Sequence, residues 1–407
     1  MSEKEKHINF GFQDGIGVGI IGGGQLAFML AQAAIRLGLV PHVLGDNATD
    51  SAARACPEFM VGRLDDETSL RSLLERVKMI VFENEFVDTG LLSRLAAERD
   101  IPCIPGPSTL NLLRDKASQK QCLKTLGIPT ARFEIYKNGI TLESWLSSTF
   151  ERFGSSFVLK WAKMGYDGKG VLIVTRKNLN SALDFCKRAV DRNIAVYAEE
   201  KIPFKRELAL VSCHSTKGEF STYPLVISEQ KENVCSRVLG PASGLGVSPQ
   251  QQSKAAGYAL KLARSTGLFG CFALELFELP TGGILVNEIA PRVHNSGHVT
   301  QDASRTSQFE NHWRGVLGLP LGPTDCAPAF AMLNLLGPAG YFQSAVNRRL
   351  PVPGPGMHLH WYGKTDVRPL RKLGHLNGTV EKRSQLKTLL RNMEKCKNKW
   401  LHQLENV

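Results

Sequence analysis

The chain has 407 residues, of which 43% are hydrophobic, and it carries 50 Lys and Arg against 38 Asp and Glu. This length predicts two or three domains, and the moderate charge with apolar residues throughout excludes a largely disordered chain. No apolar run approaches the roughly 20 residues of a membrane span and the N-terminus lacks the apolar core of a signal peptide, so we expect a cytoplasmic protein without a membrane partner.

The first part of the chain is typical of parallel βαβ units. We predict strands at 17–21, 40–44 and 79–82, and helices at 25–37 and 91–98. Strands that alternate with helices form an open parallel sheet, so the fold class is α/β.

The pattern changes after residue 107. The predicted elements there are an interrupted basic helix over 108–126, strands at 157–160, 171–174 and 195–200, and helices at 178–191 and 250–266. Strands dominate between the last two helices, and we find no internal repeat.

Three glycines follow the first strand. Gly22, Gly24 and Ala27 fit the G-x-G-x-x-G/A turn of dinucleotide-binding folds, and Asp46 lies near where a ribose-binding acid would stand. This turn favours an NAD-dependent oxidoreductase. The alternative is a tight strand-to-helix turn that binds no dinucleotide.

A second glycine-rich loop follows the strand that ends at Lys160. Its sequence, GYDGKG at 165–170, exposes backbone N–H groups and adds the charge of Lys169, which suits phosphate oxygens. It lacks the order of a Walker A loop. A mobile hairpin loop is the alternative, but it does not explain the two lysines.

A predicted hairpin places two carboxylates face to face. If strands 271–278 and 284–289 are joined by a four-residue turn at 280–283, Glu275 lies directly opposite Glu288, with Cβ atoms about 5 Å apart. Two such carboxylates need a proton or a cation. Oxygen ligands favour Mg²⁺ bound to nucleotide phosphates, with Asn287 nearby; one shared proton is the alternative.

The segment after this hairpin is rich in hydrogen-bond donors, namely Arg292, His294, Asn295, Ser296 and His298. A helical zinc site is disfavoured by a proline and a glycine within the segment, so an oxyanion or sugar site is the better interpretation.

Two basic segments follow. Lys364, Arg368, Arg371 and Lys372 form a candidate clamp for a phosphate ester, and a solvated loop is the alternative. Residues 381–407 predict a basic amphipathic helix, for which a solvated appendage is the simplest interpretation. The net charge of +12 suggests anionic ligands, but no zinc-finger or RNA-recognition pattern accompanies it, so no nucleic-acid partner is expected.

Together these motifs resemble the ATP-grasp superfamily and, within it, the carboxyaminoimidazole ribonucleotide synthetase family of purine biosynthesis. The segments that carry the resemblance are GGGQL (22–26), GYDGKG (165–170), NEIAPRVHNSGH (287–298), SQFE (307–310) and HWYGK with VRPLRKLGH (360–375). The resemblance implies an N-terminal α/β domain at 1–110, an ATP-grasp domain at 111–320, a small C-terminal domain at 321–380 and a basic helical tail at 381–407.

The resemblance also implies roles for single residues. The nucleotide-binding residues would be Lys116 and Lys160 at the phosphates, Gly165, Gly168 and Gly170 in the loop, Glu199, Glu200, Lys201 and Ile202 at adenine, Glu207 at the ribose, and Asn287. Mg²⁺ would be held by Glu275 and Glu288. The catalytic residues would be Tyr166, Asp167, Lys169, Arg292, His294 and Asn295. The substrate-binding residues would be Gln25, Leu26, Ser296, Lys364, Arg368, Arg371 and Lys372.

The implied reaction uses ATP and bicarbonate to carboxylate the amino group of 5-aminoimidazole ribonucleotide through carboxyphosphate, and a homodimer is expected. The chain departs from the family pattern at Met164, Val171, Gln230, Val299 and Leu370. These departures leave open an ATP-grasp ligase for another acid and amine. The remaining alternatives are the NAD-dependent oxidoreductase and a basic interaction protein without catalysis.

Overall fold

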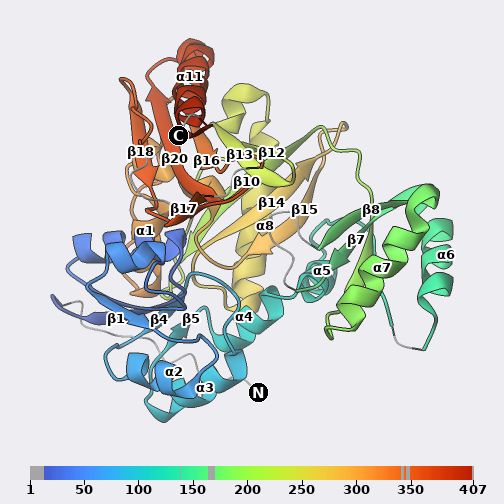
Figure 1. Cartoon of the computed structure of the whole chain (residues 1–407), viewed down its shortest axis with the longest axis horizontal. Coiled ribbons are helices and arrows are strands. Elements are labelled where there is room, and N and C mark those ends of the chain that lie inside the picture. The colour runs from blue at the N-terminus through green and yellow to red at the C-terminus, as the bar shows by residue number, and fades with distance from the viewer. Residues whose placement is uncertain (1–12, 138, 164–169, 341–342, 345–348, 406–407) are drawn as a thin grey trace.

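The computed structural model describes residues 13–405 except 138, 164–169, 341–342 and 345–348. Figure 1 shows the N-terminal sheet in blue at the lower left, a lobe in green at the right, and a large sheet between them that runs up to the C-terminal helix. No helix in the described part of the chain is long and apolar enough to cross a membrane.

The N-terminal sheet is parallel, as the sequence predicts. Its strand order is β3-β2-β1-β4-β5. The strands are β1 (Gly17–Ile21), β2 (Val40–Gly45), β3 (Glu58–Val61), β4 (Ile80–Phe82) and β5 (Cys103–Ile104), and the helices are α1 (Gln25–Arg36), α2 (Glu67–Leu74) and α3 (Thr89–Glu98). Because both faces of β1 are covered, its residues Val18 to Ile21 are all buried, which is typical of a strand in a parallel sheet.

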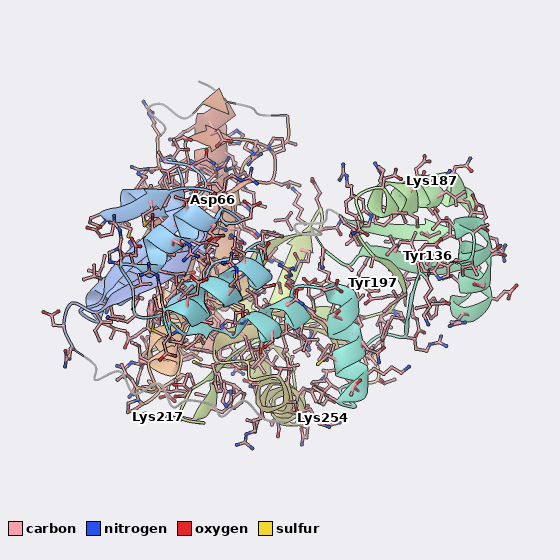
Figure 2. All side chains as sticks on the ribbon, turned by 90° about the horizontal axis from the view of Figure 1, so that it is seen from below. Asp66, Tyr136, Lys187, Tyr197, Lys217 and Lys254 are labelled. Carbon is pink, nitrogen blue, oxygen red and sulfur yellow. The ribbon has the colours of Figure 1, made fainter. Side chains whose placement is uncertain are left out.

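The lobe is a smaller antiparallel sheet with two helices on it. Its strands are β6 (Phe133–Ile135), β7 (Ser156–Trp161), β8 (Val171–Thr175) and β9 (Val196–Glu200), and its helices are α6 (Leu142–Phe153) and α7 (Leu179–Val190). The lobe has a core of its own that includes Trp145 and Phe157. Figure 2 shows Tyr136 and Lys187 in the projecting lobe and Tyr197 where the lobe meets the rest of the molecule.

The large sheet joins strands from two expected domains. Its order is β15-β14-β10-β12-β13-β16-β20-β18, with β11 on β10. The strands are β10 (Arg206–His214), β11 (Phe220–Thr222), β12 (Val226–Lys231), β13 (Val234–Gly240), β14 (Gly270–Glu278), β15 (Ile284–Ala290), β16 (Ala329–Leu336), β18 (Met357–Trp361) and β20 (Lys372–Val380). Since β13 pairs with β16, strands within 321–380 extend the preceding sheet. The domain boundaries stated above remain predictions.

The other elements connect or cover these sheets. They are α4 (Pro107–Leu113), α5 (Lys116–Thr125), α8 (Pro249–Thr266), α9 (Thr300–Ala303), α10 (Gln308–Val316), and the short strands β17 (Gln343–Ser344) and β19 (Asp366–Val367). The interrupted helix predicted over 108–126 is therefore two helices. Asp115 caps the second of them, because its side chain accepts the Ser118 N–H at 2.9 Å.

The basic tail is part of the hydrophobic core. The predicted helix is confirmed as α11 (Leu386–Glu405), which packs against β16 and β20. Leu389, Met393, Trp400 and Leu404 are buried on the side that faces the sheet. The interpretation as a solvated appendage is therefore wrong, because the apolar stripe of the helix covers the sheet and only its charged face is left to water.

The hairpin of β14 and β15 differs from the predicted one in its turn. Gly282 N–H donates to the Leu279 carbonyl at 2.9 Å and Leu279 N–H donates to the Gly283 carbonyl at 2.8 Å, so the loop has three residues. Gly282 has φ +83°, a conformation that favours glycine. Leu276 then pairs with Val286 while Glu275 pairs with Glu288, which makes Asn287 the extra residue of a β-bulge. The bulge restores the predicted Glu275–Glu288 pair.

Candidate functional site

Three carboxylates share one face of the large sheet. Glu275 of β14 lies opposite Glu288 of β15, and it pairs on its other side with Ala209 of β10. Glu207 stands two residues before Ala209, so it points to the same face. This face is where β14, β15 and β10 present charge toward the lobe.

Each carboxylate of the opposed pair has a basic side chain beside it. Lys116 Nζ lies 2.8 Å from Glu288 Oε2, and His294 Nε2 lies 3.2 Å from Glu275 Oε1. Burial alone raises the pKa of Glu275, but the hydrogen bond and charge of His294, with Lys116 and Lys160, bring that pKa below its ordinary value. The basic groups beside the pair favour compensation of its charge over a proton shared between the two carboxyls, which stays the alternative.

A buried amide places Lys116 at this pair. The Gln119 side chain donates to the Ile289 carbonyl at 2.8 Å and accepts the Ile289 N–H at 2.9 Å. The Gln119 amide thereby hydrogen-bonds the backbone of β15 as a neighbouring strand would, and it holds α5 against that strand. Lys116, one helical turn before Gln119, is in this way directed at Glu288.

Sequence reasoning missed Lys120, which is almost fully buried between the lobe and the large sheet. Glu199 of β9 forms two ion pairs, with Lys120 Nζ 2.7 Å from one carboxylate oxygen and Lys160 Nζ 2.7 Å from the other. Burial lowers the pKa of Lys120 to about 8 although Glu199 opposes that shift. The signal was available, since Lys120 follows Lys116 by four residues on the same face of one helix.

The assignment of Glu199 to adenine stays a prediction, with its backbone as the part that can bind. Its side chain is 3% exposed and both of its oxygens face lysines, so only its backbone remains for a ligand. Glu200 pairs outward with Arg132 at 2.8 Å, and Lys201 is exposed. Lys160 also donates to Asn287 Oδ1 at 3.1 Å, which connects the lobe to the β-bulge of the large sheet.

Arg292 joins the loop after β15 to the N-terminal sheet. Its guanidinium meets both oxygens of Glu85 at 3.2 Å, and Glu85 belongs to the acidic turn after β4. Burial would lower the pKa of Arg292, but Glu85 and Glu83 raise it above the ordinary value. The site therefore holds Arg292 as a fixed cation, and the role of the acidic turn was not predicted.

The next residues of the loop have defined hydrogen-bonding states. His294 Nδ1 accepts the Ser296 N–H at 3.3 Å, so the ring proton of neutral His294 is on Nε2, toward Glu275. Both side-chain polar atoms of Asn295 are buried with no protein partner among the described residues. A buried amide without partners costs free energy, so Asn295 is suited to bind a polar ligand.

The glycine turn at 22–24 is lined by carboxylates. A Cβ on Gly23 would lie 2.4 Å from Asp50 Oδ2, and one on Gly24 would lie 2.4 Å from Glu83 Oε1. Two carboxylates against the turn oppose a pyrophosphate there, while Asp46 is exposed beyond the end of β2. The turn therefore does not support the dinucleotide interpretation.

The predicted substrate residues of α1 differ from each other. Leu26 is buried in the core of the N-terminal sheet, so its side chain cannot contact a substrate, and its backbone alone is available. Gln25 is half-buried at the start of the helix.

The basic cluster forms beside Asp366. Arg371 and Arg368 both pair with that carboxylate, the second at 3.6 Å, and Lys364 Nζ lies 5.8 Å from the centre of the Tyr362 ring. The Arg371 side chain is 22% exposed and that of Arg368 is 61% exposed. The solvated-loop alternative therefore fits Arg368 but not Arg371.

Leu370 lies between these arginines at φ +62°. This left-handed conformation favours glycine over leucine. The departure thus places backbone strain inside the basic cluster.

Several predicted residues lie outside the described residues, namely Gly165, Tyr166, Asp167, Gly168 and Lys169. Gly170, which is described, has φ +72° directly before β8. The roles of the others remain predictions.

The oxygen ligands suit a nucleotide-bound Mg²⁺. Glu275 and Glu288 supply two carboxylates and Asn287 an amide oxygen at the bulge between them. In the described part of the chain no group of three or more His, Cys, Asp or Glu could hold a metal. A Mg²⁺ ion bound through phosphates takes only one or two carboxylates from the protein, so the pair is sufficient.

Comparisons with known proteins cover nearly the whole chain. Residues 16–114 match the ribonucleotide synthetase preATP-grasp domain, residues 121–309 the ATP-grasp domain, and residues 331–388 the phosphoribosylaminoimidazole carboxylase C-terminal domain. An N5-carboxyaminoimidazole ribonucleotide synthase of Synechococcus elongatus is 37% identical over 386 residues, which cover 93% of this chain and 94% of that protein.

Solved structures agree with this similarity. The N5-carboxyaminoimidazole ribonucleotide synthetase of Thermus thermophilus is 33% identical and superposes with a TM-score of 0.81 over 93% of this chain and 98% of that one. An Aspergillus clavatus N5-carboxyaminoimidazole synthase in complex with ADP and 5-aminoimidazole ribonucleotide is 28% identical, with a TM-score of 0.81 over 94% and 99% of the two chains.

Proposed function

Because the chain belongs to the N5-carboxyaminoimidazole ribonucleotide synthase family, we propose that the residues around Glu275, Glu288 and His294 form its catalytic centre. The chain is an ATP-dependent ligase that carboxylates 5-aminoimidazole ribonucleotide in purine biosynthesis. The observation that supports the location is the opposed carboxylate pair, with Lys116 and His294 on it and the lobe facing it.

The nucleotide lies between the lobe and the large sheet. Lys116 and Lys160 face its phosphates, and the backbone of 199–202 faces adenine. Bound Mg²⁺ would be held by Glu275 and Glu288 and would neutralise charge on the phosphates. Phosphoryl transfer requires mainly positioning and charge compensation from the protein, which this set of residues provides.

Bicarbonate binds in the loop after β15. Arg292, fixed by Glu85, supplies positive charge, and the unpartnered amide of Asn295 hydrogen-bonds an oxygen. A bicarbonate oxygen attacks the γ-phosphorus, ADP leaves, and carboxyphosphate forms. Arg292 and His294 hold this intermediate away from water, which would hydrolyse it.

The ribotide binds between the glycine turn and the basic cluster. Arg371 and Lys364 lie close enough to Asp50 to lower its pKa, although burial raises that pKa overall. Since Asp50 lies against Gly23, this proximity supports a phosphate clamp on the side of the turn at 22–24. The amine nitrogen of the ribotide then forms the new C–N bond with the carboxyl carbon, phosphate leaves, and the nitrogen loses one proton.

ADP release tests this function. We expect ADP formation from ATP and bicarbonate to rise when 5-aminoimidazole ribonucleotide is added, with one carboxylated product per ADP. ADP formation that ignores the ribotide but responds to another amine would instead support a ligase for a different acid and amine. The family resemblance is also the basis on which we propose a homodimer and a cytoplasmic location.

The pKa of Glu207 predicts that the KM for ATP depends on pH. Burial, followed by the charge of Glu275, raises its pKa to about 7. Above that pH the carboxylate accepts the ribose hydroxyls as charge-assisted hydrogen bonds, each stronger than a neutral one by about 1 kcal/mol. We expect the KM for ATP to fall by about fivefold between pH 6 and pH 8.

The Glu207→Gln variant separates this effect from the titration of ATP itself. Its KM for ATP should be high at both pH values and should change only as the nucleotide does. A variant that keeps the full pH dependence of the wild type would contradict the ribose assignment.

A further inference from the structure

Three imidazole rings stack behind the catalytic loop. His298 lies on His375 with ring centres 4.9 Å apart, and His375 lies on His360 at 4.5 Å with planes 10° apart. His298 comes from the loop after β15, whereas His360 and His375 are directly opposed on β18 and β20. His298 and His375 are fully buried.

Hydrogen bonds through Asp302 and Asn377 connect His360, at one end of the stack, to the backbone of His298 at the other end. His360 Nε2 lies 2.7 Å from Asp302 Oδ2, and Asn377 donates to the same oxygen at 2.6 Å. Asn377 also donates to the His298 carbonyl at 3.0 Å. Side chains of α9, β18 and β20 therefore hold both the ring and the backbone of His298.

Burial favours the neutral form of the two inner rings. Burial lowers the pKa of both His298 and His375 well below the ordinary value, and the neighbouring histidines add to that shift. His375 Nδ1 meets the Tyr362 hydroxyl at 2.8 Å, while the Nε2 atoms of His298 and His375 have no protein partner in the described structure. Buried nitrogens without partners cost stability, so packing alone does not explain why imidazoles stand here.

The stack connects two parts of the proposed site. His298 ends the segment that carries Arg292, His294 and Asn295, at the proposed bicarbonate end. His375 stands three residues after Lys372, at the start of the strand that follows Arg371. Stacked flat rings keep the two segments at a fixed distance, because a close-packed protein interior has low compressibility.

We propose that His298 and His375 are positioning residues that set the distance between the carboxylating loop and the ribotide clamp. This inference rests on the proposed function and adds to it the coupling between its two halves. Neither histidine contacts the reacting atoms. Loss of the stack lets carboxyphosphate form out of reach of the amine, and water then hydrolyses it.

The test compares three purified variants with the wild type. In His298→Ala the ring is lost, and we expect the KM for the ribotide to rise about tenfold or more, since small misplacements cost large factors in rate and binding. More than one ADP should form per carboxylated product, while the KM for ATP stays within about twofold. His298→Phe keeps a flat ring on His375 and should restore one ADP per product.

His312→Ala is the matched control. His312 is equally buried and accepts the Cys271 N–H at 3.0 Å, but it packs α10 on β14 and its ring contacts Trp313. Its loss should lower the melting temperature as His298→Ala does and leave both KM values unchanged. If His298→Ala does not fold, His360→Ala replaces it in the test. This variant removes the half-exposed outer ring, and it should also form more than one ADP per carboxylated product.

The outcomes are distinct. Equal melting losses with unchanged ribotide KM and coupling in all variants would reduce the stack to a structural role and overturn the proposal. A well-folded His298→Phe that remains uncoupled would also overturn it, because the flat ring would then be insufficient. A wild type whose ADP release ignores the ribotide would overturn the proposed function itself, before any variant is compared.

Discussion

The Glu288→Gln variant is expected to lose about a hundredfold or more of its ATP turnover while it keeps its fold. Removing one preorganised oxyanion-hole donor typically costs about a hundred- to a thousandfold in kcat, and we expect a similar cost for a charged group at a phosphoryl-transfer site. Glutamine has the shape of glutamate but not its charge, so Lys116 loses its ion pair at 2.8 Å and the proposed Mg²⁺ site loses one of two carboxylates. ADP release at saturating Mg²⁺ measures the loss.

Stability should change little in this variant. The Glu288 side chain is 33% exposed, so loss of its pair costs about 1 kcal/mol or less, and relief of repulsion from Glu275 offsets part of that. Thermal melting checks this point.

Glu278→Gln is the control from the same hairpin. Glu278 pairs with Arg206 at the far end of β14, with its side chain 3% exposed. That variant should lose more stability than Glu288→Gln but retain ATP turnover. Full turnover in Glu288→Gln at saturating Mg²⁺ would contradict the metal assignment.

The second large effect concerns the ribotide. We expect Arg371→Ala to raise the KM for 5-aminoimidazole ribonucleotide about ten- to a hundredfold, because each charge-assisted hydrogen bond to phosphate contributes about 1.5–3 kcal/mol. Asp366 holds Arg371, so its guanidinium is oriented before the ligand binds. The KM for ATP should hardly change, since the nucleotide occupies the other side of the site.

Saturation curves for both substrates measure this separation. Arg314→Ala is the matched control, because Arg314 is 31% exposed and forms a comparable pair with Glu310 at 2.9 Å on α10. It should leave both KM values unchanged. A larger effect of Arg371→Ala on ATP than on the ribotide would contradict the phosphate assignment, and so would the absence of an effect on either KM.

Local patterns in the sequence were sufficient for most elements. The strand at 17–21 matches β1, and the helix predicted over 250–266 begins one residue earlier as α8. Such elements are encoded by periodicity and by end signals such as Ser248, which caps α8. The family could be recognised for a related reason, because its motifs are contiguous segments whose residue types and order are visible without a structure.

The predicted pairing of Glu275 with Glu288 is correct because two differences from the predicted hairpin cancel each other. A four-residue turn predicted the pair, but the chain has a three-residue loop and an extra residue at Asn287. Counting along the chain cannot reveal a bulge, because a bulge depends on how the strand fits its neighbours.

By itself the sequence determined the α/β class, the strands β1, β2 and β4 with the helices α1 and α3 of the N-terminal sheet, and the residue types proposed to bind nucleotide and phosphate. Only the tertiary structure decided which of those residues meet. Lys120 and Glu199 come together across the boundary of lobe and sheet, and α11 packs as core because β16 and β20 offer it an apolar face. The stack of His298, His375 and His360 depends on strand order. Periodicity records which face of an element is apolar, but the partner of that face is set by packing between segments far apart in the chain.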